Sequence, residues 1–361
     1  MSKVRVVIVE DSLTVRSRLA EILQSDPEIE LVGQAADGKR ALELCEQLRP
    51  DIITMDMMLP LMTGLAATEY IMAHWPTPIL IVSASVNRGE LFRTYDALAA
   101  GAVDVLDKPT GNEPDGQWEK NFLSTVKLVS RIKVITHPRA RLRSMTAAPS
   151  LPPEPGLRTA PLSSEGKYEV VAIGASTGGP GAIVEVLRGL PADFQLPILL
   201  VLHINEPFGS AFADWLDAQT ARRVSHAIDG QPLTDAIGRV VMAPGHSHLV
   251  VKNGRLRLTK DAERHSCRPS VDVLFESVAR EFGARAGACL LTGMGRDGAQ
   301  GLLDIRKSGG VTIAQDEATS VIYGMPREAL LLGAAQHVLP IGQIGPTIAS
   351  LTSTAASRRI P

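Results

Sequence analysis

Short apolar runs alternate with amphipathic helical patterns along the first third of the chain. Residues 4–9 form a largely apolar run of strand length, and Val15, Leu19, Ile22 and Leu23 then recur at the spacing of one helix face. Further strands are predicted at 31–34, 52–55, 79–82 and 103–106, and further helices at 40–48, 65–72, 90–99 and 117–135. This alternation predicts a five-stranded parallel sheet flanked by helices.

A change in composition separates this region from a second one. Residues 135–167 are rich in Pro, Ser, Ala and Arg and lack apolar periodicity, which is typical of a flexible linker. The alternation resumes at Tyr168 and predicts a doubly wound, mostly parallel α/β domain over 168–350, followed by a frayed tail at 351–361. Strands are predicted at 170–174, 198–202, 239–243, 288–291, 311–314 and 337–339, with a tight hairpin at Asn253 and Gly254. The first domain is assigned to residues 1–134.

Composition narrows the possible partners. The 361 residues carry 37 Lys and Arg against 39 Asp and Glu, so the chain has no global field that favours nucleic acid. The N-terminus lacks a secretory signal and no apolar run is long enough to span a bilayer, so we expect a cytoplasmic protein without membrane insertion. Cys45, Cys267 and Cys289 show no metal-ligand spacing and are predicted to be reduced core thiols.

Polar side chains follow four of the predicted strands of the first domain. Because the carboxyl ends of parallel strands meet at one edge, these side chains should lie close together. Three carboxylates there would repel one another, so a hard cation such as Mg²⁺ is expected among them. Asp56 could then accept a phosphoryl group, balanced by the lysine ammonium and the serine hydroxyl. The set consists of Glu10, Asp11, Asp56, Ser83 and Lys108.

This set resembles that of response-regulator receiver domains, and the resemblance covers residues 1–134. It implies a flavodoxin-like fold in which a histidine kinase phosphorylates Asp56, and a cis peptide bond before Pro109. A DNA-binding response regulator would also need a helix-turn-helix and a basic face, and the sequence shows neither. The ligands that the resemblance implies for Mg²⁺ are Glu10, Asp11, Asp56 and the backbone carbonyl of Met58.

A candidate nucleophile lies at the start of the second domain. The segment 170–180 reads as a strand, a glycine-rich turn and a helix, which places Ser176 on an exposed elbow. A phosphate-binding loop is the weaker alternative because the glycine spacing does not fit G-x-G-x-x-G. A serine needs a base, and His203 directly follows the apolar strand at 198–202, so it should emerge at the same edge. The histidines that compete with it are His226, His246, His248 and His265.

A carboxylate should complete the constellation. Asp297 lies in a glycine-rich turn after another predicted strand, at the same edge, and could orient His203. The backbone N–H groups of Thr177 and Met294 are candidate oxyanion donors. Residues 174–178 also satisfy the G-x-S-x-G pattern of α/β-hydrolases, but that fold orders its triad as serine, acid and histidine.

The order Ser176, His203, Asp297 resembles that of chemotaxis protein-glutamate methylesterases, as do GASTGGP, RPSVDVLF and LTGMGRDGAQG. The resemblance covers residues 168–350. It implies a phosphorylation-activated serine hydrolase that demethylates glutamyl methyl esters on chemoreceptors, with glutamine deamidation as a second activity and no cofactor for the esterase step. The alternative is a catalytically weak scaffold that binds receptors or kinases under the same control.

Two departures from the family patterns bear on specificity and signalling. Where many receivers carry the aromatic residue of their switch, this chain has Val105. Around the predicted base the family typically reads Gln-His-Met-Pro, whereas this chain has Leu202, His203, Ile204 and Asn205. Neither departure removes a residue of the predicted chemistry.

Overall fold

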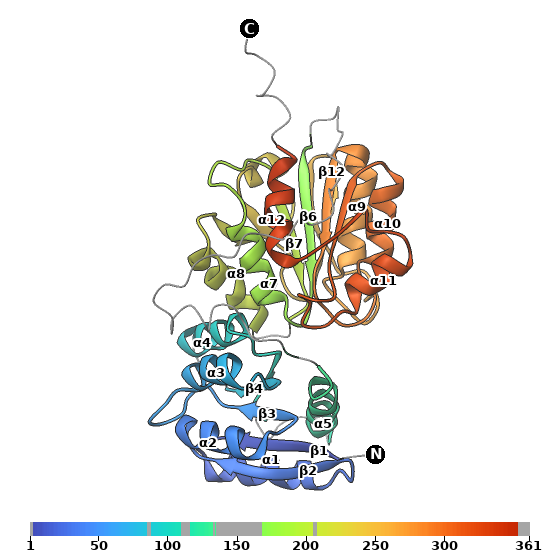
Figure 1. Cartoon of the computed structure of the whole chain (residues 1–361). Helices are drawn as coiled ribbons and strands as arrows, with labels where there is room; N and C mark the ends of the chain where they lie inside the picture. Colours follow the sequence, from blue (N-terminus) through green and yellow to red (C-terminus); the bar gives the residue numbers. More distant parts are fainter. Residues whose placement is uncertain are drawn as a thin grey trace, which may run out of the picture.

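The computed structural model describes residues 3–84, 88–109, 116–132, 134, 168–204 and 208–352. These form two α/β domains, an N-terminal one up to residue 134 and a C-terminal one from Tyr168 (Figure 1). The predicted linker at 135–167 lies outside the described residues, as does most of the predicted tail.

The N-terminal domain contains a five-stranded parallel sheet, as the sequence predicts, and the structure gives its strand order as β2-β1-β3-β4-β5. Its strands are β1 (Val4–Val9), β2 (Ile29–Ala35), β3 (Ile52–Met55), β4 (Ile79–Ser83) and β5 (Asp104–Asp107). Its helices are α1 (Leu13–Gln24), α2 (Gly38–Leu48), α3 (Gly64–His74), α4 (Arg88–Ala99) and α5 (Gln117–Val129).

Helix boundaries in this domain follow from capping. The side chains of Ser12, Asp37 and Thr63 accept backbone N–H bonds at the starts of α1, α2 and α3. The prediction that α5 extends to residue 135 is wrong, because the helix ends at Val129. Beyond it the N–H of Ile132 bonds to the carbonyl of Val129, so the chain tightens into a turn.

The C-terminal domain contains a seven-stranded parallel sheet in the order β14-β13-β12-β6-β7-β9-β8. The prediction missed β8, because this strand has three residues and only Val224 is buried among them. The strands are β6 (Val170–Ala175), β7 (Ile198–Leu202), β8 (Val224–His226), β9 (Val240–Met242), β12 (Ala286–Leu290), β13 (Val311–Gln315) and β14 (His337–Leu339).

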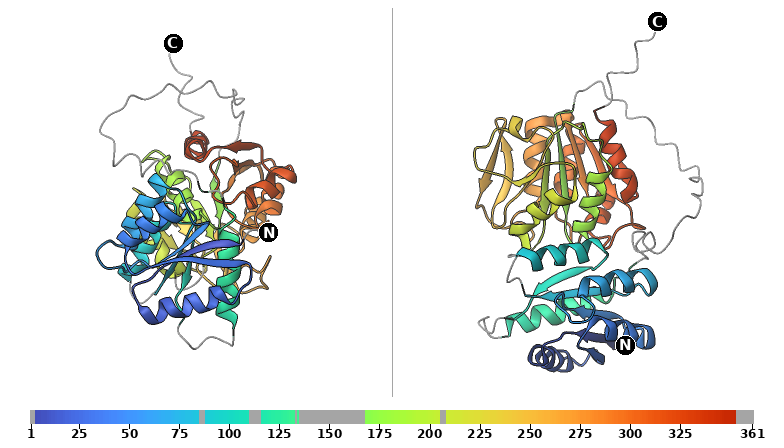
Figure 2. Two further views of the ribbon diagram at one scale, coloured as in Figure 1. Left: turned by 60° about the horizontal axis from the view of Figure 1, so that its bottom comes forward. Right: turned by 90° about the vertical axis from the view of Figure 1, so that its left-hand side faces the viewer.

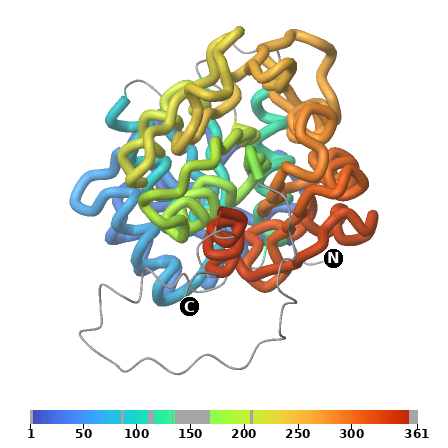
Figure 3. Tube along the Cα trace, turned by 90° about the horizontal axis from the view of Figure 1, so that it is seen from above, coloured from blue at the N-terminus to red at the C-terminus, as the bar shows by residue number. Residues whose placement is uncertain are grey.

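Helices cover both faces of this sheet, which confirms the doubly wound prediction. In Figures 1 and 3, α7, α8 and α12 lie on one side and α9, α10 and α11 on the other. These helices are α7 (Gly179–Arg188), α8 (Phe208–Gln219), α9 (Val271–Phe282), α10 (Ala299–Lys307), α11 (Met325–Leu331) and α12 (Ile341–Ser350). Two short 3-10 helices, Leu233–Ala236 and Gly283–Arg285, lie in its loops.

The predicted hairpin is confirmed as the antiparallel pair β10 (His248–Lys252) and β11 (Arg255–Thr259). Asn253 and Gly254 have φ angles of 52° and 67°. Positive φ at both central positions is what a tight hairpin turn requires, and Asn-Gly tolerates it best.

The two domains pack on each other through α4, which lies against α7 and α8 (Figures 1 and 2). The fully buried Tyr95 of α4 donates its hydroxyl to the carbonyl of Phe208. The indole Nε1 of Trp215 donates to Asp96 Oδ1 at 2.9 Å, and Arg88 pairs with Asp214 at 2.8 Å. Apolar side chains of α4, α7 and α8 belong to one hydrophobic cluster, so the contact is a packed interface.

Candidate active site

The register of the C-terminal sheet brings the predicted nucleophile and base together. On the paired strands β6 and β7, Ala175 is opposite Leu202, so the next residues, Ser176 and His203, emerge side by side. The N–H of His203 donates to the carbonyl of Ala175 at 3.0 Å. On the other side of β6, the N–H of Ser176 donates to the carbonyl of Thr292 at 3.0 Å.

The elbow that carries Ser176 needs its glycines. Gly178 has a φ of 78°, and a Cβ there would lie 2.5 Å from the Cβ of Val321. A Cβ on Gly293 would lie 2.7 Å from the Cβ of Ser176. Only glycine fits both positions, and the loop after β12 therefore lies directly against Ser176.

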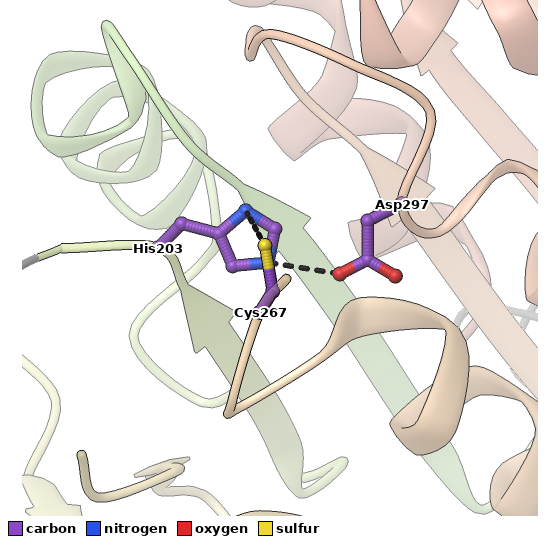
Figure 4. A group of neighbouring side chains, drawn as sticks. All are labelled: His203, Cys267 and Asp297. Atoms are coloured by element: carbon purple, nitrogen blue, oxygen red, sulfur yellow. Dashed lines mark hydrogen bonds and ion pairs between the residues drawn. The ribbon is translucent and has the colours of Figure 1, made fainter. Parts of the chain in front are cut away.

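Asp297 reaches the same rim and holds the imidazole. Its Oδ2 lies 2.9 Å from His203 Nε2 (Figure 4). Asp297 is 2% exposed, so its carboxylate is almost fully desolvated and needs hydrogen-bond donors from the protein. The structure thus places the hydroxyl, the imidazole and the carboxylate at one edge of the sheet.

The N-terminus of α9 supplies the other partners of Asp297. Ser270 Oγ donates to Oδ1 at 2.8 Å, and the backbone N–H groups of Val271 and Asp272 donate at 2.8 and 3.1 Å. A helix N-terminus favours an anion because its N–H groups lack partners within the helix. Sequence reasoning missed Ser270. Its signal was an N-cap serine before the apolar periodicity of residues 271–282.

Burial and charge act in opposite directions on this pair. Burial alone would raise the pKa of Asp297, but His203, Ser270 and Val271 bring it below its ordinary value. Burial likewise opposes the charged imidazole, yet the hydrogen bonds and charges of Asp297 and Cys267 raise the pKa of His203 to about 9. At neutral pH the imidazole is therefore protonated in this arrangement.

Ser176 and His203 line one pocket of about 360 Å³ without bonding to each other. Among the described residues Ser176 Oγ has no hydrogen-bond partner, and His203 Nδ1 lies 3.8 Å from Cys267 Sγ. Thr177 lines the pocket as well, whereas Met294 does not. A hydrogen bond therefore joins the candidate base, His203, to the candidate acid, Asp297, while Ser176 lines the same pocket without bonding to His203.

The N-terminal domain contributes to the same pocket. Asp104 and Val105 of β5 line it, and Thr177 Oγ1 donates to Asp104 Oδ2 at 3.4 Å. Burial raises the pKa of Asp104 to about 6. Val105, which stands where many receivers have an aromatic residue, is 5% exposed and lines the pocket that contains Ser176.

Of the residues around the base that depart from the family pattern, Leu202 is buried in the core and Ile204 lines the pocket. Asn205 lies outside the described residues.

The prediction that all three cysteines are core thiols is wrong for Cys267. Cys45 and Cys289 are fully buried, but Cys267 is partly exposed, because its loop faces the pocket instead of the core.

The predicted acidic cluster of the N-terminal domain assembles around Lys108. Its Nζ lies 2.8 Å from Glu10 Oε2 and 2.9 Å from Asp56 Oδ2. Glu10 and Asp56 are buried and Asp11 is exposed, and one oxygen from each lies within 4.8 Å of the others. Burial, followed by the charge of Asp56, raises the pKa of Glu10 in spite of Lys108. Close, partly desolvated carboxylate oxygens are a donor set that suits Mg²⁺.

Ser83 fits a phosphoryl acceptor site for a different reason. Its Oγ is buried without a hydrogen-bond partner among the described residues, and a buried hydroxyl in that state needs an acceptor or donor.

Met58 lies in the loop after β3 with its side chain 43% exposed. The prediction of a cis bond before Pro109 is wrong. Among the described residues the cis peptide bond joins Arg268 to Pro269, and the bond between Lys108 and Pro109 is trans. The trans form of an X–Pro bond is favoured by about 0.5–1 kcal/mol in any case.

The C-terminal domain is an α/β domain that places a serine, a histidine and an aspartate at one edge of its sheet. The N-terminal domain, to which it is joined, has the fold and the acidic cluster of a receiver domain. Residues 171–348 match the family model of the CheB methylesterase, and residues 6–114 match that of the response regulator receiver domain. The protein-glutamate methylesterase/protein-glutamine glutaminase 2 of Pseudomonas aeruginosa is 44% identical, with 98% of each chain covered. Its namesake from Anaeromyxobacter dehalogenans is 42% identical, with 97% of each chain covered. The chain belongs to the CheB methylesterase family.

A solved structure is similar as well. The crystal structure of the Thermotoga maritima CheB methylesterase catalytic domain is 34% identical, covers 51% of this chain and 98% of its own, and has a TM-score of 0.49. No helix among the described residues is long and apolar enough to cross a membrane.

Proposed function

We propose that this chain is a serine hydrolase that removes methyl groups from glutamyl methyl esters of chemoreceptors, under the control of its receiver domain. Its relatives are named protein-glutamate methylesterase/protein-glutamine glutaminase, and such enzymes transfer an acyl group from an ester or amide to water. The observation that carries the proposal is the common rim of Ser176, His203 and Asp297, with the imidazole held 2.9 Å from the carboxylate.

In this mechanism Ser176 Oγ attacks the side-chain carbonyl carbon and His203 takes its proton at Nδ1, the nitrogen that does not face Asp297. The same proton passes to the leaving methoxide, which departs as methanol. Water then attacks the acyl-enzyme, with His203 again as the base, and restores Ser176. A glutamine side chain would follow the same route and release ammonia.

Two backbone N–H groups are proposed to stabilise the oxyanion that forms. The first belongs to Thr177, which lines the pocket beside Ser176. The second belongs to Met294, whose neighbour Gly293 packs against Ser176. Donors aimed at the developing charge are usually the largest single contribution to acyl transfer.

Control is proposed to act through coverage of the pocket. In the unphosphorylated state α4 packs on α7 and α8, and Asp104 and Val105 close one side of the pocket. A histidine kinase would phosphorylate Asp56, with Mg²⁺ held by Glu10, Asp11, Asp56 and the Met58 carbonyl. When bound, the ion supplies positive charge for the transferred group. Lys108 and Ser83 would contact the phosphoryl oxygens, and the new charge would weaken the interdomain packing.

The test is methanol release from methylated receptor, with and without a small-molecule phosphodonor. We expect the wild type to respond to the phosphodonor, Asp56→Asn to keep a basal rate without response, and Ser176→Ala to lose release. Deleting residues 1–167 should raise the basal rate, and an unchanged or lower rate would contradict coverage. A serine-directed probe that fails to label Ser176 would favour the scaffold alternative.

The cellular location follows from the substrate class in this proposal. Relatives act on protein glutamates, and in chemoreceptors we place these on the cytoplasmic segments, so the chain would work in the cytoplasm without entering the membrane. Fractionation of cells that express the chain at its natural level tests this, with recovery in the soluble fraction expected.

A further inference from the structure

The imidazole of His203 has two nitrogens, and both have partners in the structure. Nε2 faces Asp297 at 2.9 Å, and Nδ1 faces Cys267 Sγ at 3.8 Å (Figure 4). The proposed mechanism needs Nδ1 to receive the proton of Ser176. In this arrangement Nδ1 has the thiol as its partner, and no hydrogen bond joins it to Ser176 among the described residues.

We propose that Cys267 is a positioning residue that holds the Nδ1 atom of His203 and competes for it with Ser176. This inference deepens the proposed function and rests on it. It goes further by assigning a role to a residue outside the serine, histidine and aspartate set, and it predicts that the resting imidazole is not free to act as a base.

The location of Cys267 supports the competition. The thiol lies on the loop before α9, directly before Arg268, and its Sγ also donates to the carbonyl of His265 at 3.4 Å. It lines the same pocket as Ser176 and His203. A thiol is a weak hydrogen-bond donor and acceptor, so a serine hydroxyl aligned by bound substrate can displace it.

The charge balance around the imidazole gives the competition a measurable consequence. Asp297 and Cys267 both favour the protonated ring, whereas burial opposes it. Removing the thiol therefore leaves Asp297 as the main partner, and the ring loses its proton at lower pH. The other titratable groups that line the pocket are Asp104 from β5, His246, Glu263 and Arg268. They are unchanged in the variants below.

The test compares Cys267→Ala with Cys267→Ser in the full-length chain. We expect Cys267→Ala to move the acid limb of the kcat/KM profile down by about one pH unit, which is about a tenfold gain on the acid side. Cys267→Ser keeps a hydrogen-bonding group and should stay close to the wild type. Cys289→Ala removes a thiol from the core of the same domain and serves as the matched control, with an unchanged acid limb expected.

A second measurement separates this inference from the proposed function. The ring titration of His203 can be followed by NMR with labelled histidine, without any substrate, and its midpoint should fall in Cys267→Ala. If methanol release depends on Ser176 but neither the acid limb nor the midpoint moves in Cys267→Ala, the inference is overturned and the esterase stands. If no variant releases methanol but the midpoint falls, the contact between Cys267 and His203 stands and the esterase does not.

Discussion

Ser270 offers a direct test of how Asp297 is held. In Ser270→Ala, Asp297 loses one of its four hydrogen-bond donors, a hydroxyl at 2.8 Å. A hydrogen bond to a charged group contributes about 1.5–3 kcal/mol. The N-cap bond from Val273 N to Ser270 Oγ is lost as well, which costs about 1 kcal/mol. We therefore expect the free energy of unfolding to fall by roughly 2.5–4 kcal/mol.

Catalysis should suffer with stability in this variant. If about half of the lost hydrogen-bond energy is expressed when the imidazole is charged in the transition state, kcat/KM falls by about three- to tenfold. Denaturant unfolding and methanol release, measured on the same preparation, give the two numbers.

Ser277→Ala is the matched control on the same helix. Ser277 is also buried, but its Oγ accepts from Val251 N at 3.0 Å and donates to the carbonyl of Leu274, away from the pocket. This variant should lose about 1–3 kcal/mol of stability and keep kcat/KM. A folded Ser270→Ala protein with the wild-type kcat/KM would refute the role of the α9 N-terminus in holding the acid.

Four further outcomes are expected. Because the folded pKa of His203 is raised to about 9 from an ordinary 6.5, kcat/KM of the unphosphorylated chain should climb from pH 7 to 9, and a flat profile would contradict this. The stability that the raised pKa of His203 contributes should be fully present just below pH 6.5, where Asp297 is still charged, and lost as the pH rises through about 9; because the pKa of Asp297 is lowered, the contribution of the pair should also be lost in strong acid, and thermal unfolding measures both limits. Asp104→Asn removes a carboxyl whose charge is disfavoured by burial, so it should strengthen the closed state and lower the basal rate without a phosphodonor, whereas a higher rate would argue against this. Asp96→Ala removes the bond from Trp215, worth about 0.5–1.5 kcal/mol, and should raise the basal rate about two- to tenfold, with thermal unfolding to confirm that each domain stays folded.

The alternation of apolar and polar residues sufficed to predict most of the fold. The bounds of β3, β7 and β14 agree with the predicted ranges, because a buried parallel strand is an unbroken apolar run between polar turns. The pattern carries little information where burial is weak. β8 has a single buried residue, so its sequence carries almost no strand signal. The end of α5 is set by local turns instead of by periodicity.

The candidate site was predictable to the extent that it depends on strand ends. Ser176 and His203 each follow an apolar run, and adjacent parallel strands then place them side by side. Ser270 and Cys267 could not be found in this way, because their roles depend on how the loop before α9 packs against the ends of β7 and β12. That packing is tertiary, and a core location remained the simpler prediction for the thiol.

One strand connects the two sites that the proposed regulation must couple. Asp104 and Val105 of β5 line the pocket, and Lys108, directly after the strand, contacts Asp56 with its Nζ. From Asp104 to Lys108 the chain spans about 13 Å at roughly 3.3 Å per residue. In the proposed regulation a rotating aromatic side chain would therefore not be needed over this distance, because a displacement of Lys108 would act on the same short backbone segment that lines the pocket. The β-branched Val105, with its stiff side chain, would suit such a displacement of the whole strand.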